Sequence, residues 1–294
     1  MHLAGQLIGS GVRADHTPGL AANARPGGLL EVFVGAGRGA SLQCAPSMPG
    51  VWLALHGHVQ LGLPEGNLTL HPRELLVTEE GPRVHVRARG PACWLAVMAP
   101  RSTWRQLLTG SVDGRASGGV LVTAAHAAPN ALRRTALGLA RAALAAAPAR
   151  NAPALVADFA QSLVELQSVF DAMIDRCPGR SLAQRRSVFA RLQRVRRYIE
   201  ANSHLDLDTP ELARRANYSL SHFIRSYRRV FDETPHAALV ASRLERAHAL
   251  LGSSALAVGE VALASGFENR CAFSRVFKRH FGVTAQEVRR AVAA

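Results

Sequence analysis

Residues 266–282 read GFENRCAFSRVFKRHFG, with phenylalanines and basic residues at regular spacing. Phe273, Phe277 and Phe281 recur every four residues, a spacing that places them on one face of a helix. Basic residues occupy the other faces of that helix. A similar phrase, NYSLSHFIRSYRRVFD, occurs about fifty residues earlier, at 217–232. The sequence therefore predicts one helical unit that is used twice.

The two phrases and the residues before them align position by position. Ala213 corresponds to Ala262, and Tyr218 corresponds to Phe267. After a shift of one residue, the positions that correspond are Phe223, Arg225, Tyr227, Arg228, Arg229 and Phe231 with Phe273, Arg275, Phe277, Lys278, Arg279 and Phe281.

Each unit is predicted to be a short helix, a tight turn and a second helix. An alanine on the first helix lets two helices cross closely, and the aromatic residue in the turn fills the angle between them. This arrangement is a helix-turn-helix, whose second helix can enter the major groove of DNA. A basic helical bundle without a DNA function is the alternative, and two basic units in tandem favour DNA binding.

The charge of the chain agrees with a polyanionic partner. The formal net charge of the 294 residues is +14. Residues 181–294 hold 19 Lys/Arg and 10 Asp/Glu, a net charge of +9, so the shorter part carries most of the excess. Such a chain is attracted to nucleic acid, the commonest polyanion in cells.

Other sequence features argue against metal, disulfide and membrane roles. Cys44, Cys93, Cys177 and Cys271 lie far apart, which indicates neither a zinc site nor a disulfide framework. No apolar run approaches the roughly 18 residues that cross a bilayer. The N-terminus lacks the basic start and apolar core of a signal peptide. We therefore expect a cytoplasmic protein.

Residues 1 to about 105 read as short strands separated by Gly and Pro. Segments rich in Val and Leu lie at 29–35, 51–57, 58–63, 74–80, 83–90 and 93–100. Residues 58–63 and 83–88 alternate polar and apolar residues, as half-buried strands do. Many short strands at near-regular spacing predict an all-β sandwich or barrel.

The period changes to that of helices over about 129–176. One helix is predicted to end at Pro148, and a second covers 152–176. Apolar residues of the second helix step by three and four, which forms a seam that includes Phe159, Leu163, Leu166, Phe170 and Met173. This seam either packs on the chain's own N-terminal region or forms a dimerisation interface. Residues 177–187, rich in Pro, Gly, Ser and Arg, read as a linker.

From about Val188 to Arg290 the sequence resembles the AraC/XylS family of transcription regulators. The run that carries most of this resemblance is GF…F.R.FKR.FG.T in the second half. Two positions depart from the family pattern: Asp232 stands where Gly is usual, and Ala285 stands where Pro is usual. We expect Asp232 to make the end of the first recognition helix less favourable.

The resemblance implies an α+β protein of two domains. Residues 1–176 would form a cupin-like sensory and dimerisation domain, and 188–294 an AraC-type DNA-binding domain. The implied function is that of a transcription regulator, an activator that binds double-stranded DNA and contacts RNA polymerase. A homodimer and control by a small-molecule effector or a protein partner are also implied, with no cofactor.

The family's recognition helices meet base edges through exposed positions early in each helix. The corresponding residues here are Ser221, His222, Arg225, Asn269, Arg270 and Arg275. Arginine can bind guanine O6 and N7 together, and asparagine can bind adenine in the same way. The residues that come later and suit phosphates are Arg228, Arg229, Lys278 and Arg279. Two such helices on one chain would occupy successive major grooves about 10 bp apart, so that one subunit covers close to 20 bp.

The rival interpretation is a cupin-fold metal enzyme, or a small-molecule binding module with a basic accessory domain. His56 and His58 flank Gly57 and imitate a metal-binding HxH pair, and His85 could supply a later ligand. The segment before Gly57 offers no His or Glu to complete such a site, so these three are read as ordinary strand residues. Trp52 and Trp94 either line an effector pocket or belong to the core.

Overall fold

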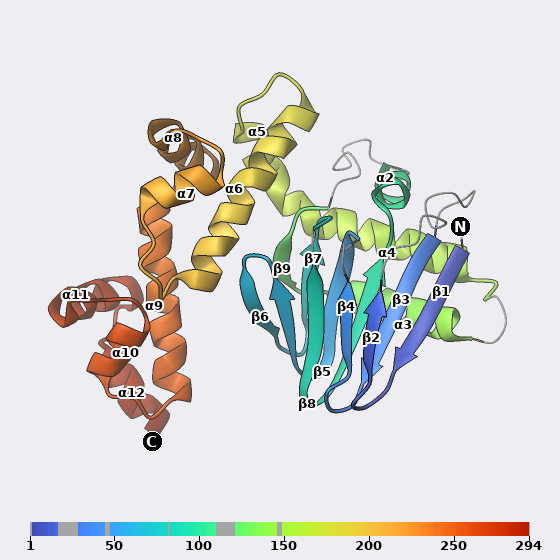
Figure 1. Ribbon diagram of the computed structural model, residues 1–294, viewed down its shortest axis with the longest axis horizontal. Helices are drawn as coiled ribbons and strands as arrows, with labels where there is room; N and C mark the ends of the chain where they lie inside the picture. The colour runs from blue at the N-terminus through green and yellow to red at the C-terminus, as the bar shows by residue number, and fades with distance from the viewer. Residues whose placement is uncertain are drawn as a thin grey trace. The chain divides into compact units, whose positions relative to one another are not determined.

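The computed structural model describes residues 2–16, 29–44, 48–81, 83–109, 121–145 and 149–293 (Figure 1). The chain divides into two compact units. Unit 1 comprises Met1–Asp175 and Arg180–Arg186, and unit 2 comprises Arg176–Gly179 and Ser187–Ala294. Among the helices of the described residues, none has the length and apolar character needed to cross a membrane.

The described part of unit 1 is built on a nine-stranded sheet. The strands are β1 His2–Ile8, β2 Arg13–His16, β3 Leu29–Ala36, β4 Ser41–Cys44, β5 Gly50–Leu63, β6 Gly66–Leu70, β7 Glu74–Thr78, β8 Val84–Met98 and β9 Ala124–Ala127. Their order is β1-β3-β8-β5-β7-β9, with β2 beside β4, β4 also beside β8, and β6 beside β5. The strand-rich N-terminal region predicted from the sequence is confirmed, whereas its cupin-like closure stays a prediction.

Two strands are longer than the sequence predicted. The segments at 51–57 and 58–63 are one strand, β5, and those at 83–90 and 93–100 merge into β8. Gly57, which separates the first two segments, has φ +67°, and the β5–β8 register shifts around it. A Cβ at Gly57 would lie 2.4 Å from the carbonyl oxygen of Pro91. The glycine therefore forms a bulge within a continuous strand, where the sequence suggested a break.

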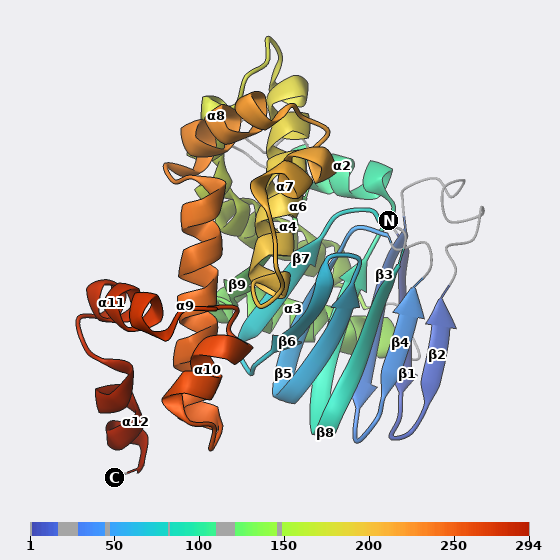
Figure 2. The ribbon, with the colours of Figure 1, turned by 60° about the vertical axis from the view of Figure 1, so that its left-hand side comes forward.

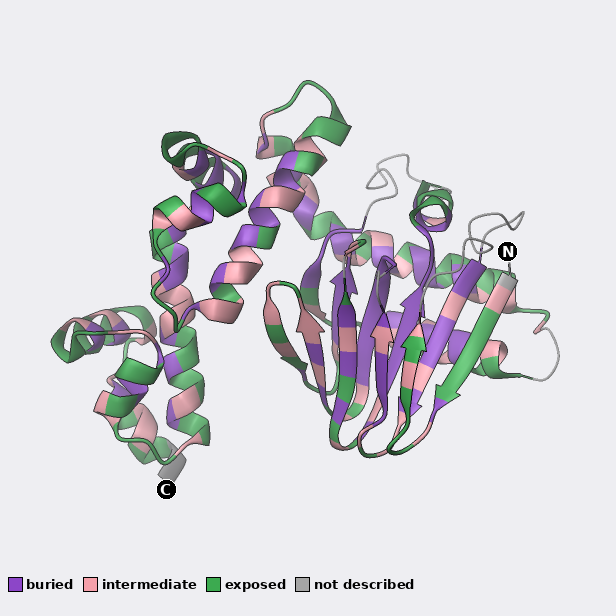
Figure 3. Cartoon of the chain, in the orientation of Figure 1, coloured by how far each residue is buried: buried purple, intermediate pink, exposed green. Residues whose placement is uncertain are grey.

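In the described part of unit 1, three helices pack against one face of the sheet, over the apolar residues of that face. Helices α3 (Asn130–Leu144) and α4 (Ala152–Gln167) lie along that face in both views (Figure 1, Figure 2). Helix α2 (Arg101–Thr109) adds Trp104 and Leu108 to the same core. A second core on the opposite face contains Trp52, Trp94 and Met98. Figure 3 shows the resulting alternation of buried and exposed bands along the strands.

The apolar seam of the second predicted helix belongs largely to this core. Phe159 and Leu163 are 1% and 0% exposed and pack with the sheet, and half-buried Leu166 packs against the same cluster. The helix is interrupted by a 3₁₀ turn at Ser168–Phe170 before α5 (Asp171–Arg176) begins. Phe170 is buried with its ring 5.7 Å from that of His126, and Met173 is half-buried. Phe159 and Leu163 therefore have no surface left for a second copy, and self-association stays a prediction.

Unit 2 is helical. Its helices are α6 Leu182–Asn202, of which the residues from Ser187 onward belong to unit 2, α7 Thr209–Arg215, α8 Leu220–Phe231, α9 Pro235–Ser253, α10 Val258–Ala264, α11 Arg270–Phe281 and α12 Ala285–Ala293. Because α6 begins at Leu182, a helix occupies the second half of the segment that was predicted to be a linker. The helices predicted to flank two turns are present as α7–α8 and α10–α11.

Candidate nucleic-acid interface

The two turns between paired helices have the same backbone geometry. Asn217 has φ +55° and its counterpart Gly266 has φ +89°, so both adopt the left-handed conformation. The next residue donates its N–H to the buried alanine of the preceding helix in each case, Tyr218 to Ala213 and Phe267 to Ala262, both at 3.0 Å. The repeat predicted from the sequence is therefore a repeat of backbone hydrogen bonds as well.

Gly266 has a further reason to lack a side chain. A Cβ at this position would lie 2.8 Å from Nε of Arg243 and 2.9 Å from the carbonyl oxygen of Ser203. Arg243 donates from Nε to that same oxygen at 2.8 Å. The second turn is thus pressed against a side chain of α9 and the end of α6, which holds the start of α11 in place.

An aromatic stripe sets which faces of α8 and α11 remain exposed. Phe223 and Tyr227 are fully buried, with ring centroids 5.6 Å apart, and Tyr227 lies 4.7 Å from Phe231. In α11 the corresponding distances are 5.3 Å between Phe273 and Phe277 and 4.6 Å to Phe281. Because the stripe has the same spacing in both helices, it turns equivalent residues outward.

All ten residues predicted to contact DNA are exposed. The base-reading set is Ser221, His222, Arg225, Asn269, Arg270 and Arg275, and the phosphate set is Arg228, Arg229, Lys278 and Arg279. Arg225 and Arg275 occupy equivalent places, because each lies five residues after the first residue of its helix, Leu220 in α8 and Arg270 in α11. Exposure makes these side chains available to a ligand, while their contacts with DNA stay a prediction.

Cys271 is an exposed residue that the predicted base-reading set omits. It is the counterpart of Ser221, and it lies four residues before Arg275 and seven before Lys278, on one face of α11. Because equivalent residues of α8 and α11 are fifty positions apart, the alignment of the two helices would have added Cys271 to the set that contains Ser221.

Asn269 has a structural role that limits how it could read a base. It is the N-cap of α11, and its Oδ1 accepts a hydrogen bond of 2.9 Å from the backbone N–H of Ala272. Binding adenine in the bidentate way needs the amide oxygen and the amide nitrogen together. While the cap is formed, Asn269 is left with its N–H groups as donors, so the pairing predicted from the sequence competes with the cap.

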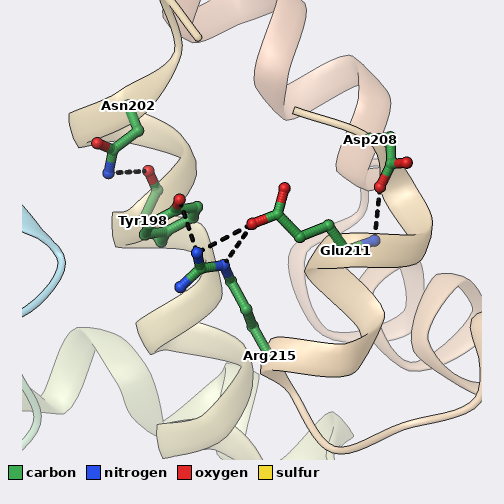
Figure 4. Close-up of polar contacts among 5 residues, drawn as sticks. All are labelled: Tyr198, Asn202, Asp208, Glu211 and Arg215. Atoms are coloured by element: carbon green, nitrogen blue, oxygen red, sulfur yellow. Dashed lines mark hydrogen bonds and ion pairs between the residues drawn. The ribbon is translucent and has the colours of Figure 1, made fainter. Parts of the chain in front are cut away.

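Arg215 joins α7 to α6 in the first half (Figure 4). Its guanidinium lies 3.7 Å from the ring centroid of Tyr198 and donates to the Tyr198 hydroxyl at 2.8 Å. It also donates to Glu211 at 3.0 and 2.9 Å. The Glu211 carboxylate thus accepts both of these bonds from Arg215. Asp208 is the N-cap of α7, because its Oδ1 accepts a hydrogen bond from the N–H of Glu211 at 2.6 Å.

The two recognition helices end in the same way. Asp232 has φ +60° and Gly282 has φ +76°, and each donates its N–H to the carbonyl four residues earlier at 2.9 Å. An aspartate in this conformation is less favourable than a glycine, as the family comparison in the sequence suggested. The Asp232 carboxylate forms an ion pair with Arg176, another residue of unit 2.

The residues considered for an effector pocket lie in the core of unit 1. Trp52 and Trp94 are each 1% exposed. The indole N–H of Trp52 donates to Oγ1 of Thr78 at 3.0 Å, and that of Trp94 donates to the carbonyl oxygen of Ala40 at 3.2 Å. A Cβ at Gly35 would overlap the Trp94 ring, which shows how closely the indole is packed. Both tryptophans therefore act as core residues in this structure.

The histidines of the rival metal interpretation are strand residues. His56, His58 and His85 lie on β5 and β8, and His58 contacts the ring of His71 at 4.9 Å. Within the part of the chain that the structure describes, no three His, Cys, Asp or Glu side chains gather closely enough to hold a metal ion.

Residues 212–291, which run from α7 into α12, match the helix-turn-helix domain family. Among curated proteins, the Msm operon regulatory protein of Streptococcus mutans is 25% identical over 129 residues, which cover 44% of this chain and 46% of the relative. The MmsAB operon regulatory protein of Pseudomonas aeruginosa is 30% identical over 95 residues, 32% of this chain and 31% of the relative. The chain thus spans less than half the length of these relatives. The matched proteins are regulators and not enzymes.

Solved structures also give matches that cover part of this chain. A probable AraC family transcriptional regulator from Rhodopseudomonas palustris is 28% identical and has a TM-score of 0.34. The match covers 35% of this chain and 96% of that one.

Proposed function

Because the C-terminal region of this chain is a helix-turn-helix domain of the AraC type, we propose that the chain is a sequence-specific DNA-binding transcription regulator. The observation that carries the proposal is the pair of equivalent exposed arginines, Arg225 and Arg275, on two helices held by matching turns. A basic unit that carries two such helices is typical of proteins that bind duplex DNA.

The exposed residues divide the work of binding by their chemistry. Arg225 and Arg275 would each bind O6 and N7 of a guanine through the planar guanidinium, which specifies the base. Arg228, Arg229, Lys278 and Arg279 would bind phosphates, which position the helices without reading sequence. Two recognition helices in successive major grooves would lie about 10 bp apart on one side of the duplex.

We extend the proposal to activation of transcription through contact with RNA polymerase. Unit 1 would supply sensory control, by an effector or a partner protein, and would support a homodimer. The resemblance of the C-terminal region to the AraC/XylS family supports these roles. Sedimentation of the purified chain with and without DNA would test the dimer.

A cupin-fold enzyme or binding module is the second candidate. The strand-rich unit 1 and its histidines on β5 and β8 are the observations in its favour. Metal analysis of the purified protein separates the two candidates, because a metal enzyme would carry near-stoichiometric metal. A regulator that acts through α8 and α11 needs none.

The decisive experiment compares cognate and random DNA. A site is first selected from genomic fragments bound by the full chain and located by footprinting. We expect Arg275→Ala to weaken binding to that site by about 1–3 kcal/mol and to change binding to random DNA much less. Equal losses on both DNAs would show that Arg275 does not read a base.

Two matched arginine variants calibrate this result. Arg279→Ala should weaken binding to all sequences alike and reduce the salt slope by about one. Arg290→Ala, an exposed arginine of α12, removes the same charge outside the recognition helices and should leave the ratio of cognate to random affinity unchanged. A chain that protects no sequence in footprinting would contradict the proposed function itself.

A further inference from the structure

Five neighbouring strands of unit 1 carry polar residues at alternate positions on one face, and most of these side chains are exposed or half-buried. The sheet pairs β2 with β4, β4 with β8, β8 with β5 and β5 with β6. The residues on this face are Arg13 and Asp15, Ser41 and Gln43, His85, Arg87 and Arg89, His58 and Gln60, and Asn67 and Thr69. Ser41 is buried, Gln43, His85 and Gln60 are half-buried, and the others are exposed. The inward positions between them, such as Leu42, Val86 and Leu61, are buried. We name this surface the polar sheet face.

The register brings residues of different strands together on this face. Arg87 lies between Ser41 on one side and Gln60 on the other, and Thr69 follows across the next strand. Arg89 is paired with His58. Arg87 and Arg89 are exposed and stand about 7 Å apart along β8, since alternate residues of a strand share a face.

Two of the three arginines are held by neutral amides. Nη2 of Arg13 donates to Oε1 of Gln43 at 2.8 Å, and Nε of Arg89 donates to Oε1 of Gln60 at 2.8 Å. These bonds orient the guanidinium groups without cancelling their charge. Asp15, 3.4 Å from Arg13, is the single acidic residue of the polar sheet face as defined. The face therefore carries pre-oriented donors and a net positive charge.

His85, near the centre of the face, responds to this charge. Its own burial lowers the pKa of His85, and the positive charges of Arg13 and Arg87 lower it further. Arg13 lies on β2 and Arg87 on β8, so positive charges from two strands that are not neighbours act on the same imidazole.

The residue types indicate which anion would bind. Protein partners generally bury an apolar centre, and the polar sheet face has no Leu, Ile, Val or Met in its outward positions. Single-stranded nucleic acid stacks its bases on Phe, Tyr or Trp, which this face also lacks. Arg, Gln, Asn, Ser and Thr are the side chains that bind phosphate and sugar oxygens of duplex DNA.

We propose that the polar sheet face binds the sugar–phosphate backbone of duplex DNA next to the site read by α8 and α11, without reading its sequence. The inference rests on the proposed function and assigns unit 1 a direct contact with DNA. Affinity of the full chain would then depend on the length of DNA that flanks the selected site.

The test uses the full chain and two duplexes. The short duplex holds only the base pairs of the selected site whose substitution weakens binding, and the long duplex extends it by about two helical turns of arbitrary sequence on each side. We expect the wild-type chain to bind the long duplex about tenfold more tightly at low salt. The double variant Arg87→Ser, Arg89→Ser should lose most of this gain, keep its affinity for the short duplex, and reduce the salt slope on the long duplex by about two.

A matched pair of substitutions controls for the loss of two positive charges. It also controls for the larger number of positions at which a longer duplex can be bound non-specifically. Arg134→Ser with Arg141→Ser removes two exposed arginines from α3 and should retain the gain. Tryptophan fluorescence, which reports unit 1, checks that both double variants stay folded.

Several results would overturn the inference. One is a wild-type chain that binds both duplexes equally, which leaves the proposed function intact. Another is a gain that survives in the Arg87, Arg89 variant or that is lost equally in the α3 variant. Competition by poly-glutamate but not by unrelated duplex would assign the face to an acidic protein. A wild-type chain that binds neither duplex overturns the proposed function together with the inference.

Discussion

Asn217 and Asp232 adopt left-handed backbone at the two positions where the second half of unit 2 has Gly266 and Gly282. At these positions both halves of the repeat have the same positive φ angle, although the residue type differs. Asn and Asp are the commonest residues after glycine in this conformation. The first half therefore forms the same turn and the same helix end at a somewhat higher conformational cost.

Asp232 allows that cost to be measured. We expect Asp232→Gly to be more stable than Asp232→Ala by about 1–2 kcal/mol, because only glycine adopts φ +60° without strain. Both substitutions remove the ion pair with Arg176, so the comparison isolates the backbone term. Urea unfolding followed by far-ultraviolet circular dichroism measures the difference. Equal stability of the two variants would show that the helix end relaxes away from the left-handed conformation.

We expect His126 to make the stability of unit 1 depend on pH. Its burial beside Phe170 and Gln167 lowers the pKa of the imidazole below its usual value near 6.5. The unfolded chain then binds the proton more readily than the folded one. The stabilisation is therefore complete above about pH 6.5 and is lost as the pH falls toward the folded-state pKa.

Urea unfolding of unit 1 at several pH values between about 7.5 and 5, monitored by tryptophan fluorescence, would reveal this loss. All the tryptophans of the chain lie in that unit. The His126→Asn variant should lose less stability than wild type over this range. Some dependence should persist, since burial and two arginines also lower the pKa of His85. An identical pH slope in variant and wild type would exclude His126 as a source.

At the scale of elements, the helices of unit 2 were predictable and several strands of unit 1 were not. Helical periodicity is local, so α8 and α11 follow from their aromatic spacing. Gly57 has the same local signature in a turn and in a bulge, and the choice depends on the backbone of a distant strand, at Pro91. Short strands such as β4 and β6 have no pattern of their own and form by pairing with β8 and β5.

Helix α7 is attached to α6 through the contact of Arg215 with Tyr198, and a double-mutant cycle would measure that attachment. We expect Arg215→Met and Tyr198→Leu to show a coupling energy of about 0.5–1 kcal/mol, as half-exposed cation–π pairs do. Urea unfolding of the four proteins gives the value.

The neighbouring Arg214 is the control for this cycle. It is exposed on the same helix, so Arg214→Met should change stability by less than about 0.5 kcal/mol. A coupling energy near zero between Arg215 and Tyr198 would mean that α7 is held by its buried Leu212 and Ala213 alone.

At the scale of the whole molecule, the candidate interface was more predictable than the parts of unit 1. The repeat assigned equivalent surfaces to α8 and α11 because a buried aromatic stripe determines what remains outside. It could not show that the Asn269 oxygen caps α11, since capping depends on the local backbone angle. The seam of Phe159 and Leu163 was ambiguous for a general reason: a helix buries the same stripe against its own sheet or a second chain.

The separate cores of the two units predict how DNA would affect their stability. Unit 1 has its cores around Leu95 and Trp94, and the second half of unit 2 has its own around Phe273 and Phe277. A ligand that binds only folded unit 2 stabilises it by about 2.7 kcal/mol at a free concentration of 100 times Kd. With the short duplex, we therefore expect the urea midpoint measured by circular dichroism to increase. The midpoint measured by tryptophan fluorescence should stay unchanged.

Arg275→Ala should reduce the shift in circular dichroism at the same DNA concentration, because weaker binding gives less stabilisation. The long duplex adds a second comparison. If the polar sheet face binds flanking DNA, the long duplex should also raise the urea midpoint of the fluorescence transition. The double variant Arg87→Ser, Arg89→Ser should abolish this increase. A fluorescence transition that moves together with circular dichroism on the short duplex would contradict separate unfolding, since it would mean that the two units unfold as one cooperative body.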